Sequence, residues 1–494
     1  MIAAAFLAPV WCLVPFPPTR SQDPVHPDLA DLAGRWEQAM EACGVPALAV
    51  VLVEGDEVVH RVTLGRRDPA RDVPVTKDTM FYIASTTKTY VAFALAQLAE
   101  AGKVELDAPV ARYLPRFRLA DPELTKTITV RDLLCHRHGL NSREIVLLDA
   151  FTGEINEERY YHFLERVESP GRVAYSNVHF TLAGRVIEAV SGESWREYLA
   201  KHVFAPAGMT RTSGYADWMY AQDDVAIPAQ VVDGHAQAAP VRKTDRTMHA
   251  AGGLGTSIDD LSRWLRLQLG RGAIGGQRLL SERATEATWE LQSESKDDAE
   301  FGPSAGFALA WQRGSYRGQL ELRHGGDYAG SASAAMFLPE LGLALGILAT
   351  GGAGAGAVRQ LVATDVRERL MADDEVRDPL PALLERARAE KQRDERRAAE
   401  TRPSARAALT LSLPLASYAG VYRNEWLGTL TLEARGAELA ARLGDFAFEL
   451  ATPAEDRVEL HSSGPLEAAG AFELDGKSVL AVTLDLGEPV RFAR

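Results

Sequence analysis

The chain has 494 residues, of which 46% are hydrophobic and 25% are charged, as is ordinary for a soluble globular protein. Its length predicts two or more domains, one of them large. The formal net charge of −14 argues against a protein that binds nucleic acid or an anionic membrane surface.

The N-terminal segment 1–24 is apolar from Ile2 to Phe16 and then becomes polar. The apolar run is too short to span a bilayer, and it predicts a signal segment and export to the periplasm or the medium. No Lys or Arg precedes the run and no clear cleavage site follows it, so the alternative is an N-terminal arm. No other segment approaches transmembrane length, and no stable membrane insertion is expected.

Three cysteines, Cys12, Cys43 and Cys135, have a spacing that fits neither a zinc site nor a disulfide framework. Cys43 and Cys135 are expected to be buried thiols, with a single bridge between them as the alternative. His136 and His138 are two apart, which also suits no zinc spacing. The sequence therefore predicts neither a metal nor a cofactor.

Segment 25–375 is predicted to be one domain, beginning with a helix from Asp28 to about Cys43 that Gly44 ends. Two apolar runs around Gly55-Asp56 predict a β-hairpin. The next helix begins near Phe81, and a short one follows a strand-like start at 128–140. Further helices are predicted over 175–190, 194–209 and 258–269, the last with Ser257 or Thr256 as its N-cap.

The hydrophobic period then changes to that of strands. Short strand-like runs occupy 306–314, 320–326, 331–339 and 341–350. The mixture predicts an α+β domain in which the N-terminal hairpin and these late strands share one antiparallel sheet.

Segment 376–412 is rich in Ala, Arg and Glu and predicts a charged, solvated linker helix with a thin apolar stripe. Its glutamates alternate with its arginines, which argues against nucleic acid as its partner. Segment 413–494 contains short alternating strands with turn signals, and it predicts a small all-β barrel or sandwich.

The stretch from Phe81 onward carries Ser85 and Lys88, three residues apart, where an apolar helix begins. Such residues share a helix face. Burial and the positive end of the helix dipole both lower a lysine pKa, so Lys88 can serve as a base for Ser85. The alternative is an N-cap serine beside a lysine that reaches solvent.

Two further short motifs contain side chains suited to catalysis. Tyr175 and Asn177 form a Tyr-x-Asn pair; a phenol beside an ammonium loses its proton more easily, and an amide both donates and accepts. His324, Gly325 and Gly326 follow a strand-like run, and the glycines let a ligand backbone approach closely. The alternatives are a packed tyrosine at a turn and a surface histidine at a bulge.

Ser-x-x-Lys, Tyr-x-Asn and His-Gly-Gly in this order resemble the serine β-lactamase and penicillin-binding-protein superfamily, closest to its class C branch. The similar stretches run from about Asp28 to Leu370. The tail after Leu413 resembles the lipocalin-like domain often appended to these hydrolases. The resemblance implies a β-lactamase/transpeptidase-like fold, an antiparallel sheet flanked by helices plus a helical subdomain, followed by a small β-barrel.

The resemblance also implies roles for the site residues. Ser85 would be the acylated nucleophile, and Lys88 and Tyr175 would share the general-base and general-acid work. Asn177 would hold the substrate amide or Lys88. His324 would stand where relatives carry a lysine, and the backbone N–H groups of Ser85 and Asp327 would form the oxyanion hole.

Two departures from the family pattern matter. His324 is a weaker anchor for a substrate carboxylate than lysine, and it is expected to make binding of anionic substrates fall as pH rises through the histidine pKa. Cys135, His136 and Arg137 replace small polar residues and are expected to affect the rim of the cleft. Specificity is expected to lie in 211–247 and 142–161.

A rival motif is Gly352-x-Gly354-x-x-Ala357, which follows an apolar run and is close to a dinucleotide fingerprint. No second strand ending in an acid follows it, so a strand-to-helix turn in the core sheet is the preferred interpretation.

The sequence thus predicts a metal-independent serine hydrolase that acts through an acyl-enzyme on esters or on D-amino-acid peptides and amides. A β-lactamase is the weaker variant because of His324. The alternative is a β-lactam- or peptide-binding or sensing module on the same fold that does not turn over. The expected partner is a small-molecule or peptide substrate, and the oligomeric state stays open.

Overall fold

The structure is a computed structural model. It describes residues 29, 31–232, 235–295, 304–370, 378–401, 410–452, 454–461, 468–486 and 488–494. The predicted leader, 1–24, lies outside the described residues. Among the described helices, none combines the length and the hydropathy needed to cross a membrane.

An eight-stranded antiparallel sheet forms the centre of the large domain, in the order β10-β11-β12-β13-β14-β15-β1-β2. The N-terminal hairpin is β1 (Ala47–Glu54) and β2 (Glu57–Gly65), and β1 pairs with β15 (Leu343–Thr350). The predicted sharing of one sheet by the hairpin and the late strands is therefore confirmed. The remaining strands are β10 (Ser293–Glu294), β11 (Ser304–Phe307), β12 (Gln312–Tyr316), β13 (Gln319–Tyr328) and β14 (Ser331–Leu338).

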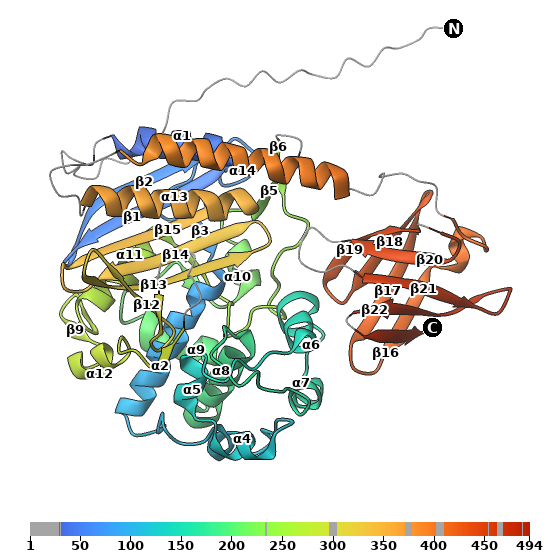
Figure 1. Cartoon of the computed structure of the whole chain (residues 1–494), viewed down its shortest axis with the longest axis horizontal. Coiled ribbons are helices and arrows are strands. Elements are labelled where there is room, and N and C mark those ends of the chain that lie inside the picture. The colour runs from blue at the N-terminus through green and yellow to red at the C-terminus, as the bar shows by residue number, and fades with distance from the viewer. Residues whose placement is uncertain are drawn as a thin grey trace, which may run out of the picture.

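Both faces of this sheet are covered, so its central strands are apolar on both sides. In β1 the side chains alternate between two cores: Ala47, Ala49, Val51 and Val53 belong to one, and Leu48, Val50 and Leu52 to the other. Figure 1 shows three helices over one face, α1 (Leu32–Cys43), α13 (Ala353–Leu370) and α14 (Leu380–Thr401). The helix α11 (Ile258–Leu269) covers the opposite face, and Ser257 is its N-cap, as predicted.

The helical subdomain lies on the α11 side of the sheet (Figure 1). Its two longest helices, α2 (Thr87–Glu100) and α8 (Asn177–Ser191), contact one another. The shorter elements around them are α3 (Val110–Tyr113), α4 (Pro122–Thr127), α5 (Val130–Leu134), α6 (Arg143–Val146), η3 (Leu147–Thr152), α7 (Glu157–Leu164), α9 (Trp195–Leu199), η4 (Ala200–Phe204), α10 (Ala216–Tyr220) and α12 (Glu282–Ala287).

Three small sheets complete the large domain. One has the order β3-β7-β4 and consists of β3 (Met80–Tyr82), β7 (Gly255–Ser257) and β4 (Thr212–Ser213). The others are the pairs β5 (Ala229–Val232) with β6 (His235–Ala238), and β8 (Ala273–Ile274) with β9 (Gln277–Arg278). Region 211–247, predicted to be irregular, thus contains a helix and three short strands.

The glycine-rich rival motif lies between β15 and α13. Gly351 and Gly352 have positive φ values of 145° and 62°, and they turn the chain from the central sheet into the helix. A Cβ at Gly354 would lie 2.2 Å from the carbonyl oxygen of Cys43, so the glycine permits close packing against the end of α1. These glycines thus form a strand-to-helix turn in the core sheet.

The charged helix α14 packs on the large domain, where the sequence predicted a solvated linker. Its apolar stripe, Leu380, Leu384 and Ala387, is buried in the core that α1 and α13 share. Three buried positions among its described side chains are enough to dock this 22-residue helix.

The C-terminal segment folds into a closed barrel of eight antiparallel strands. Its elements are the turn η5 (Leu415–Ser417) and the strands β16 (Gly420–Asn424), β17 (Gly428–Arg435), β18 (Glu438–Leu443), β19 (Phe446–Ala451), β20 (Arg457–His461), β21 (Ala468–Leu474), β22 (Val479–Asp485) and β23 (Pro489–Ala493). The predicted β-barrel is confirmed, and Figure 1 shows it in red at the side of the large domain.

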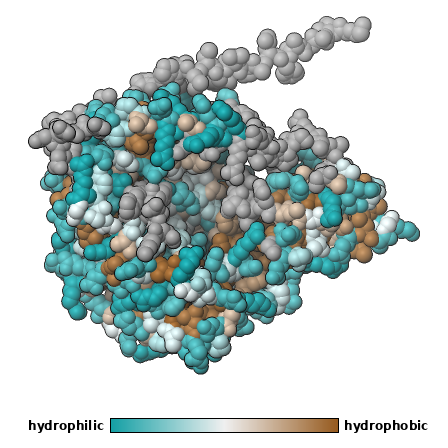
Figure 2. All heavy atoms as spheres, viewed as in Figure 1, coloured by the Kyte–Doolittle hydropathy of each residue, from teal (hydrophilic) through white to brown (hydrophobic). Residues whose placement is uncertain are grey.

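The barrel docks on the segment from α6 to α7. Leu147 and Leu148 share a buried cluster with the barrel core, and the ring centroids of Phe151 and Phe446 lie 5.5 Å apart. His162 stacks on Trp426 with 3.3 Å between centroids. On the face seen in Figure 2, hydrophobic residues gather near this junction between hydrophilic surfaces. Much of 142–161, where specificity was expected, therefore packs against the barrel.

The two cysteines in the described part of the chain, Cys43 and Cys135, are buried and form no disulfide. The prediction of buried thiols is confirmed. Burial raises the pKa of the Cys135 thiol, which makes it a poor nucleophile at neutral pH.

Candidate active site

Ser85 lies in a single 3-10 turn, η2 (Ala84–Thr86), between β3 and α2. The residue before it, Ala84, is buried and has a φ of 45°, a left-handed conformation that non-glycine residues rarely adopt. Such strain clusters at functional sites and is held in place by the surrounding packing. The N-cap of α2 is Thr86, without a side-chain capping bond, so Ser85 is not a capping serine.

Lys88 is fully buried and does not reach solvent. Its Nζ lies 3.0 Å from Ser85 Oγ, 2.8 Å from Asn177 Oδ1 and 2.5 Å from the carbonyl oxygen of Ala251. Burial lowers the pKa of Lys88 well below its ordinary value. A neutral amine has two donors for the two carbonyl oxygens and a lone pair for the serine hydroxyl.

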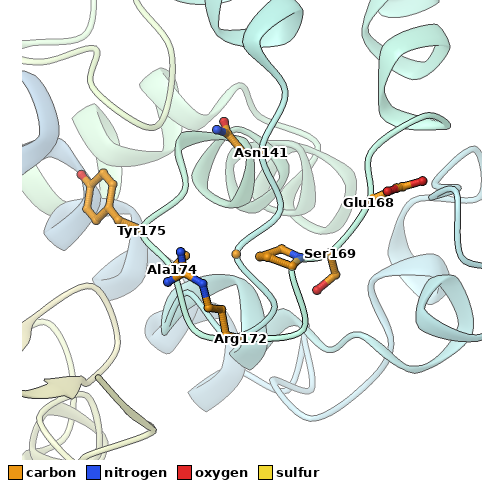
Figure 3. Close-up of a pocket in the computed structure, with 8 residues that line it drawn as sticks. Asn141, Glu168, Ser169, Arg172, Ala174 and Tyr175 are labelled. Carbon is orange, nitrogen blue, oxygen red and sulfur yellow. The ribbon is translucent and has the colours of Figure 1, made fainter. Parts of the chain in front are cut away.

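Tyr175 and Asn177 stand at the start of α8, where Ser176 is the N-cap. The Tyr175 hydroxyl lies 3.4 Å from His324 Nε2, and the ring centroid lies 4.9 Å from Lys88 Nζ. Although 43% of the residue is exposed, its hydroxyl faces His324, and in Figure 3 it points away from the neighbouring pocket that Asn141, Ser169 and Arg172 line. Desolvation raises the pKa of Tyr175 well above 10, with a hydrogen bond to Ser85 as a smaller opposing effect.

The pKa shift of Tyr175 corrects the expectation that its phenol loses its proton easily. The cation expected beside it is the buried amine of Lys88, whose own pKa is lowered. No full positive charge therefore stabilises the phenolate of Tyr175 at neutral pH. At neutral pH the geometry therefore offers Lys88 as a proton acceptor and Tyr175 as a proton donor.

His324 lies in β13 and is only 3% exposed, so it is not a surface histidine. Its Nδ1 bonds to the carbonyl oxygen of Ala310, and its Nε2 faces Tyr175. Burial, together with Lys88, lowers the pKa of His324 to about 3. The predicted titration of His324 in the neutral range is therefore wrong: the ring is uncharged there and binds only by hydrogen bonding.

The strand β13 passes close to Ser85 because Gly326 has no side chain. A Cβ at Gly326 would lie 2.2 Å from the carbonyl oxygen of Ile83 and 2.9 Å from the Ser85 nitrogen. Gly325 is its neighbour in the strand, paired with Ala334, and Asp327 follows, paired with Ala332. The backbone of Ser85 and that of the His324–Asp327 segment are thus brought together, as an oxyanion hole requires.

Arg359 of α13 supports this part of the strand from behind. Its guanidinium donates to the carbonyl oxygens of Gly326 at 2.8 Å and Ser333 at 3.0 Å, and it pairs with the Asp327 carboxylate at 2.8 Å. Ser333 Oγ in turn donates to the carbonyl oxygen of Ile83 at 2.6 Å. The side chain of Asp327 is therefore turned toward α13.

His136 forms the floor beneath Tyr175, not the rim that the sequence suggested. It is fully buried, with a ring centroid 4.5 Å from that of Tyr175. Its Nδ1 accepts a hydrogen bond from the Ser176 backbone at 3.0 Å, and burial lowers its pKa well below the ordinary value. A φ of 57° turns its side chain inward, which a sequence pattern does not reveal.

A second buried lysine, Lys243, lies near the barrel junction. Its Nζ donates to the carbonyl oxygens of Ala150 at 2.6 Å and Thr247 at 3.0 Å, and it lies 3.9 Å from the ring centroid of Tyr328. Burial lowers the pKa of Lys243 to about 7, with Asp149 as an opposing influence. Sequence reasoning missed this residue, which stands in a region predicted to be irregular.

The structure brings every sequence-predicted site residue to one place, between the central sheet and the helical subdomain. It adds two residues that no motif marked, Arg359 and Ser333, and it places His136, which was expected at the rim, beneath Tyr175. His136 and His138, the rejected metal pair, point to different partners, since His138 Nε2 lies 3.8 Å from Asp132.

Residues 32–367 match the family model described as Beta-lactamase. Among curated relatives, Penicillin-binding protein 4 of Amycolatopsis lactamdurans is 27% identical over 64% of this chain and 85% of its own length. Unguisins hydrolase ungD' of Aspergillus campestris is 25% identical over 66% of this chain and 61% of its own length. The match thus spans less than two thirds of the second relative.

Solved structures share the fold. The octameric penicillin-binding protein homologue of Pyrococcus abyssi aligns over 94% of this chain and all of its own, with a TM-score of 0.58 and 20% identity. A structure of SurE aligns over 94% of this chain and 99% of its own, with a TM-score of 0.58 and 21% identity. The penicillin-binding protein of Bacillus halodurans aligns over 67% and 98%, with a TM-score of 0.54 and 23% identity.

Proposed function

We propose that this chain, which belongs to the beta-lactamase family, is a serine hydrolase that acts through an acyl-enzyme on esters or on D-amino-acid peptides and amides. The observation that carries the proposal is the contact between Lys88 and Ser85. A buried amine with a lowered pKa lies 3.0 Å from the hydroxyl oxygen at the start of α2. This is the arrangement of an activated nucleophile.

Acylation begins when the neutral amine of Lys88 takes the proton of the Ser85 hydroxyl. Ser85 Oγ then attacks the substrate carbonyl carbon, and the developing oxyanion accepts hydrogen bonds from the backbone N–H groups of Ser85 and Asp327. Tyr175 gives its phenolic proton to the leaving oxygen or nitrogen as the bond to the acyl carbon breaks. The proton held by Lys88 then returns the phenol to its neutral form.

Deacylation reverses these roles with water as the nucleophile. Tyr175 and Lys88 together take one proton from the attacking water, and the ester bond to Ser85 breaks with return of a proton to Oγ. The raised pKa of Tyr175 keeps its phenol protonated at neutral pH, so that it has a proton to give, and the lowered pKa of Lys88 leaves its amine free to accept one.

The proposed substrate class depends on the His324-Gly325-Gly326 motif and on the relatives. A neutral His324 offers no positive charge to a β-lactam carboxylate, which makes penicillin hydrolysis the weaker candidate. One relative is named a hydrolase of unguisins, which supports hydrolysis as the outcome of acylation. Export stays a prediction from the leader-like segment 1–24.

The test is labelling with a fluorophosphonate, followed by mass spectrometry of the adduct and by assays with a chromogenic short-chain ester and a D-peptide. We expect the adduct on Ser85 and ester turnover well beyond one equivalent. An adduct on another serine, with Ser85 untouched, would reject the mechanism. Release of a single equivalent with a stable acyl-enzyme would favour the binding or sensing module instead.

A further inference from the structure

The turn Gly444-Asp445 joins the barrel strands β18 and β19 and is bonded to two segments of the large domain. The Asp445 nitrogen donates to the carbonyl oxygen of Thr152 at 2.8 Å, and the Asp445 carboxylate accepts from Thr244 Oγ1 at 2.8 Å. A Cβ at Gly444 would lie 2.3 Å from the carbonyl oxygen of Thr152, so a glycine is needed for this close approach. The turn therefore fits one docking position on the large domain.

Phe446 follows this turn and begins a row of aromatic rings that leads to the candidate active site. It is 1% exposed, and its ring meets that of Phe151 edge to face with 5.5 Å between centroids. The Phe151 ring lies 5.2 Å from that of Tyr328, and Tyr328 lies edge to face with Tyr82 at 5.5 Å. Rings at these separations are in contact. The row thus connects the barrel to the end of β3, which directly precedes the turn that carries Ser85.

Tyr328 directly follows Asp327, whose backbone N–H is assigned to the oxyanion hole. The Tyr328 hydroxyl donates to the carbonyl oxygen of Ala150 at 3.0 Å. Ala150 belongs to η3, whose Leu147 and Leu148 are buried in the cluster that forms the barrel core. The end of β13 is therefore held by η3, and η3 is held by the barrel.

The end of β13 needs such support because its own sheet holds it on one side only. The strand β12 pairs with β13 as far as Arg323, whereas β14 pairs with it as far as Tyr328. Within the described sheet, the segment from His324 to Tyr328 thus has a strand neighbour on one edge. Donors of an oxyanion hole must be held within about 0.5 Å of their working position.

We propose that the barrel is a positioning domain for the active site. It holds the Asp327 N–H in place through Phe446, Phe151 and Tyr328, which act as positioning residues. The inference rests on the proposed function for the role of that N–H, and hydrogen exchange tests it without reference to turnover.

The kinetic experiment compares Phe446→Ala with Trp426→Ala in the full chain. Both changes remove an aromatic contact between the barrel and the large domain, but Trp426 stacks on His162 of α7. For a chromogenic short-chain ester, Phe446→Ala should lower kcat about tenfold and leave KM within about twofold, as for an interaction made only in the transition state. Trp426→Ala should leave both values within about twofold.

Two milder variants keep the test decisive if Phe446→Ala does not fold. Phe446→Leu keeps an apolar side chain against Phe151 and should recover most of kcat. Tyr328→Phe keeps the ring and removes only the hydrogen bond to Ala150, so kcat should fall about threefold with KM unchanged. Equal losses of kcat in Phe446→Ala and Trp426→Ala, or wild-type kcat in Tyr328→Phe, would overturn the proposal.

Amide hydrogen exchange separates this inference from the proposed function. Followed by mass spectrometry, exchange of segments 147–152 and 325–330 should be faster in Phe446→Ala than in the wild type, and Trp426→Ala should leave 325–330 unchanged. Unchanged exchange of 325–330 in Phe446→Ala would overturn the inference even for an active hydrolase. A wild type that turns over no ester but shows the expected exchange would reject the proposed function, while the support of Tyr328 by the barrel would stand.

Discussion

Two lysines in the described part of the large domain are buried, and their surroundings give them different chemistry. Lys88 and Lys243 both have pKa values lowered by burial. The amine of Lys88 faces two carbonyl-type oxygens and the Ser85 hydroxyl, whereas that of Lys243 faces two backbone carbonyls and the Tyr328 ring. Burial lowers the pKa of a lysine, and only a partner with a transferable proton makes that lysine a base for catalysis.

The strongest test of this comparison is the pair Lys88→Met and Lys243→Met. Loss of the base should lower kcat for an ester about a thousandfold, within the range for general acid–base catalysis. The matched change at Lys243 should leave kcat within about threefold, because that amine touches no reacting group. The comparison fails if both variants lose activity to the same extent while circular dichroism shows them folded.

Tyr175→Phe tests whether the acid and the base act as one unit. The single change should cost about a hundredfold in kcat, and the double variant with Lys88→Met should be little worse than Lys88→Met alone. The reason is that the two groups share one proton path through Ser85. Kinetics of the wild type, both single variants and the double variant give the coupling, and fully multiplicative losses would contradict a shared path.

Loss of the Lys243 amine should change the stability of the folded protein. At pH 9.5, Lys243→Met should lower the free energy of unfolding by about 1–3 kcal/mol, because the carbonyls of Ala150 and Thr247 lose their donor. Urea unfolding at several pH values measures the difference.

The difference in the free energy of unfolding between the wild type and Lys243→Met should change with pH in a definite direction. The folded pKa of Lys243 is about 7 and the ordinary value is 10.5, so between these values the unfolded chain binds more protons. The wild type should therefore lose stability relative to Lys243→Met as pH falls from about 10 to 7. Lys88 contributes equally to both proteins and cancels. If the difference in unfolding free energy stays constant between pH 7 and 10, Lys243 is charged in the folded protein over this range.

The smallest expected effect concerns His324. Its pKa is lowered to about 3, so the ring is neutral above about pH 4 and gains charge only below that. The ratio of kcat/KM for an anionic ester to that for its neutral analogue should stay constant between pH 5 and 8. Parallel pH profiles measure this ratio, and a tenfold fall across the interval would show that His324 titrates in the neutral range after all.

The sequence alone predicted those features that depend on residue spacing along one element or on a regular hydrophobic period. Ser85 and Lys88 are one helical turn apart, so their contact follows from spacing alone. The hairpin of β1 and β2 follows from two apolar runs around Gly55-Asp56, and the barrel strands follow from short segments of alternating apolar residues.

Contacts set by the tertiary fold could not be predicted from the sequence. Arg359 approaches Gly326 only because α13 packs across β14 and β15, and no local pattern marks it. His136 points inward because of a left-handed backbone turn, and Lys243 is buried in a segment whose composition is polar. The same burial reversed the expected behaviour of Tyr175 and His324, whose pKa values depend on solvent exclusion and not on residue type.

The position of β1 has a consequence for the synthesis of the chain. Its partner β15 is made about 300 residues later, so at bacterial or eukaryotic elongation rates the hairpin waits about 15–60 s for its neighbour. During that time the residues Leu48, Val50 and Leu52 have neither β15 nor α13 to cover them. The nascent chain thus carries an apolar strand edge in need of protection, and chaperone demand or slow refolding should follow from this one pairing.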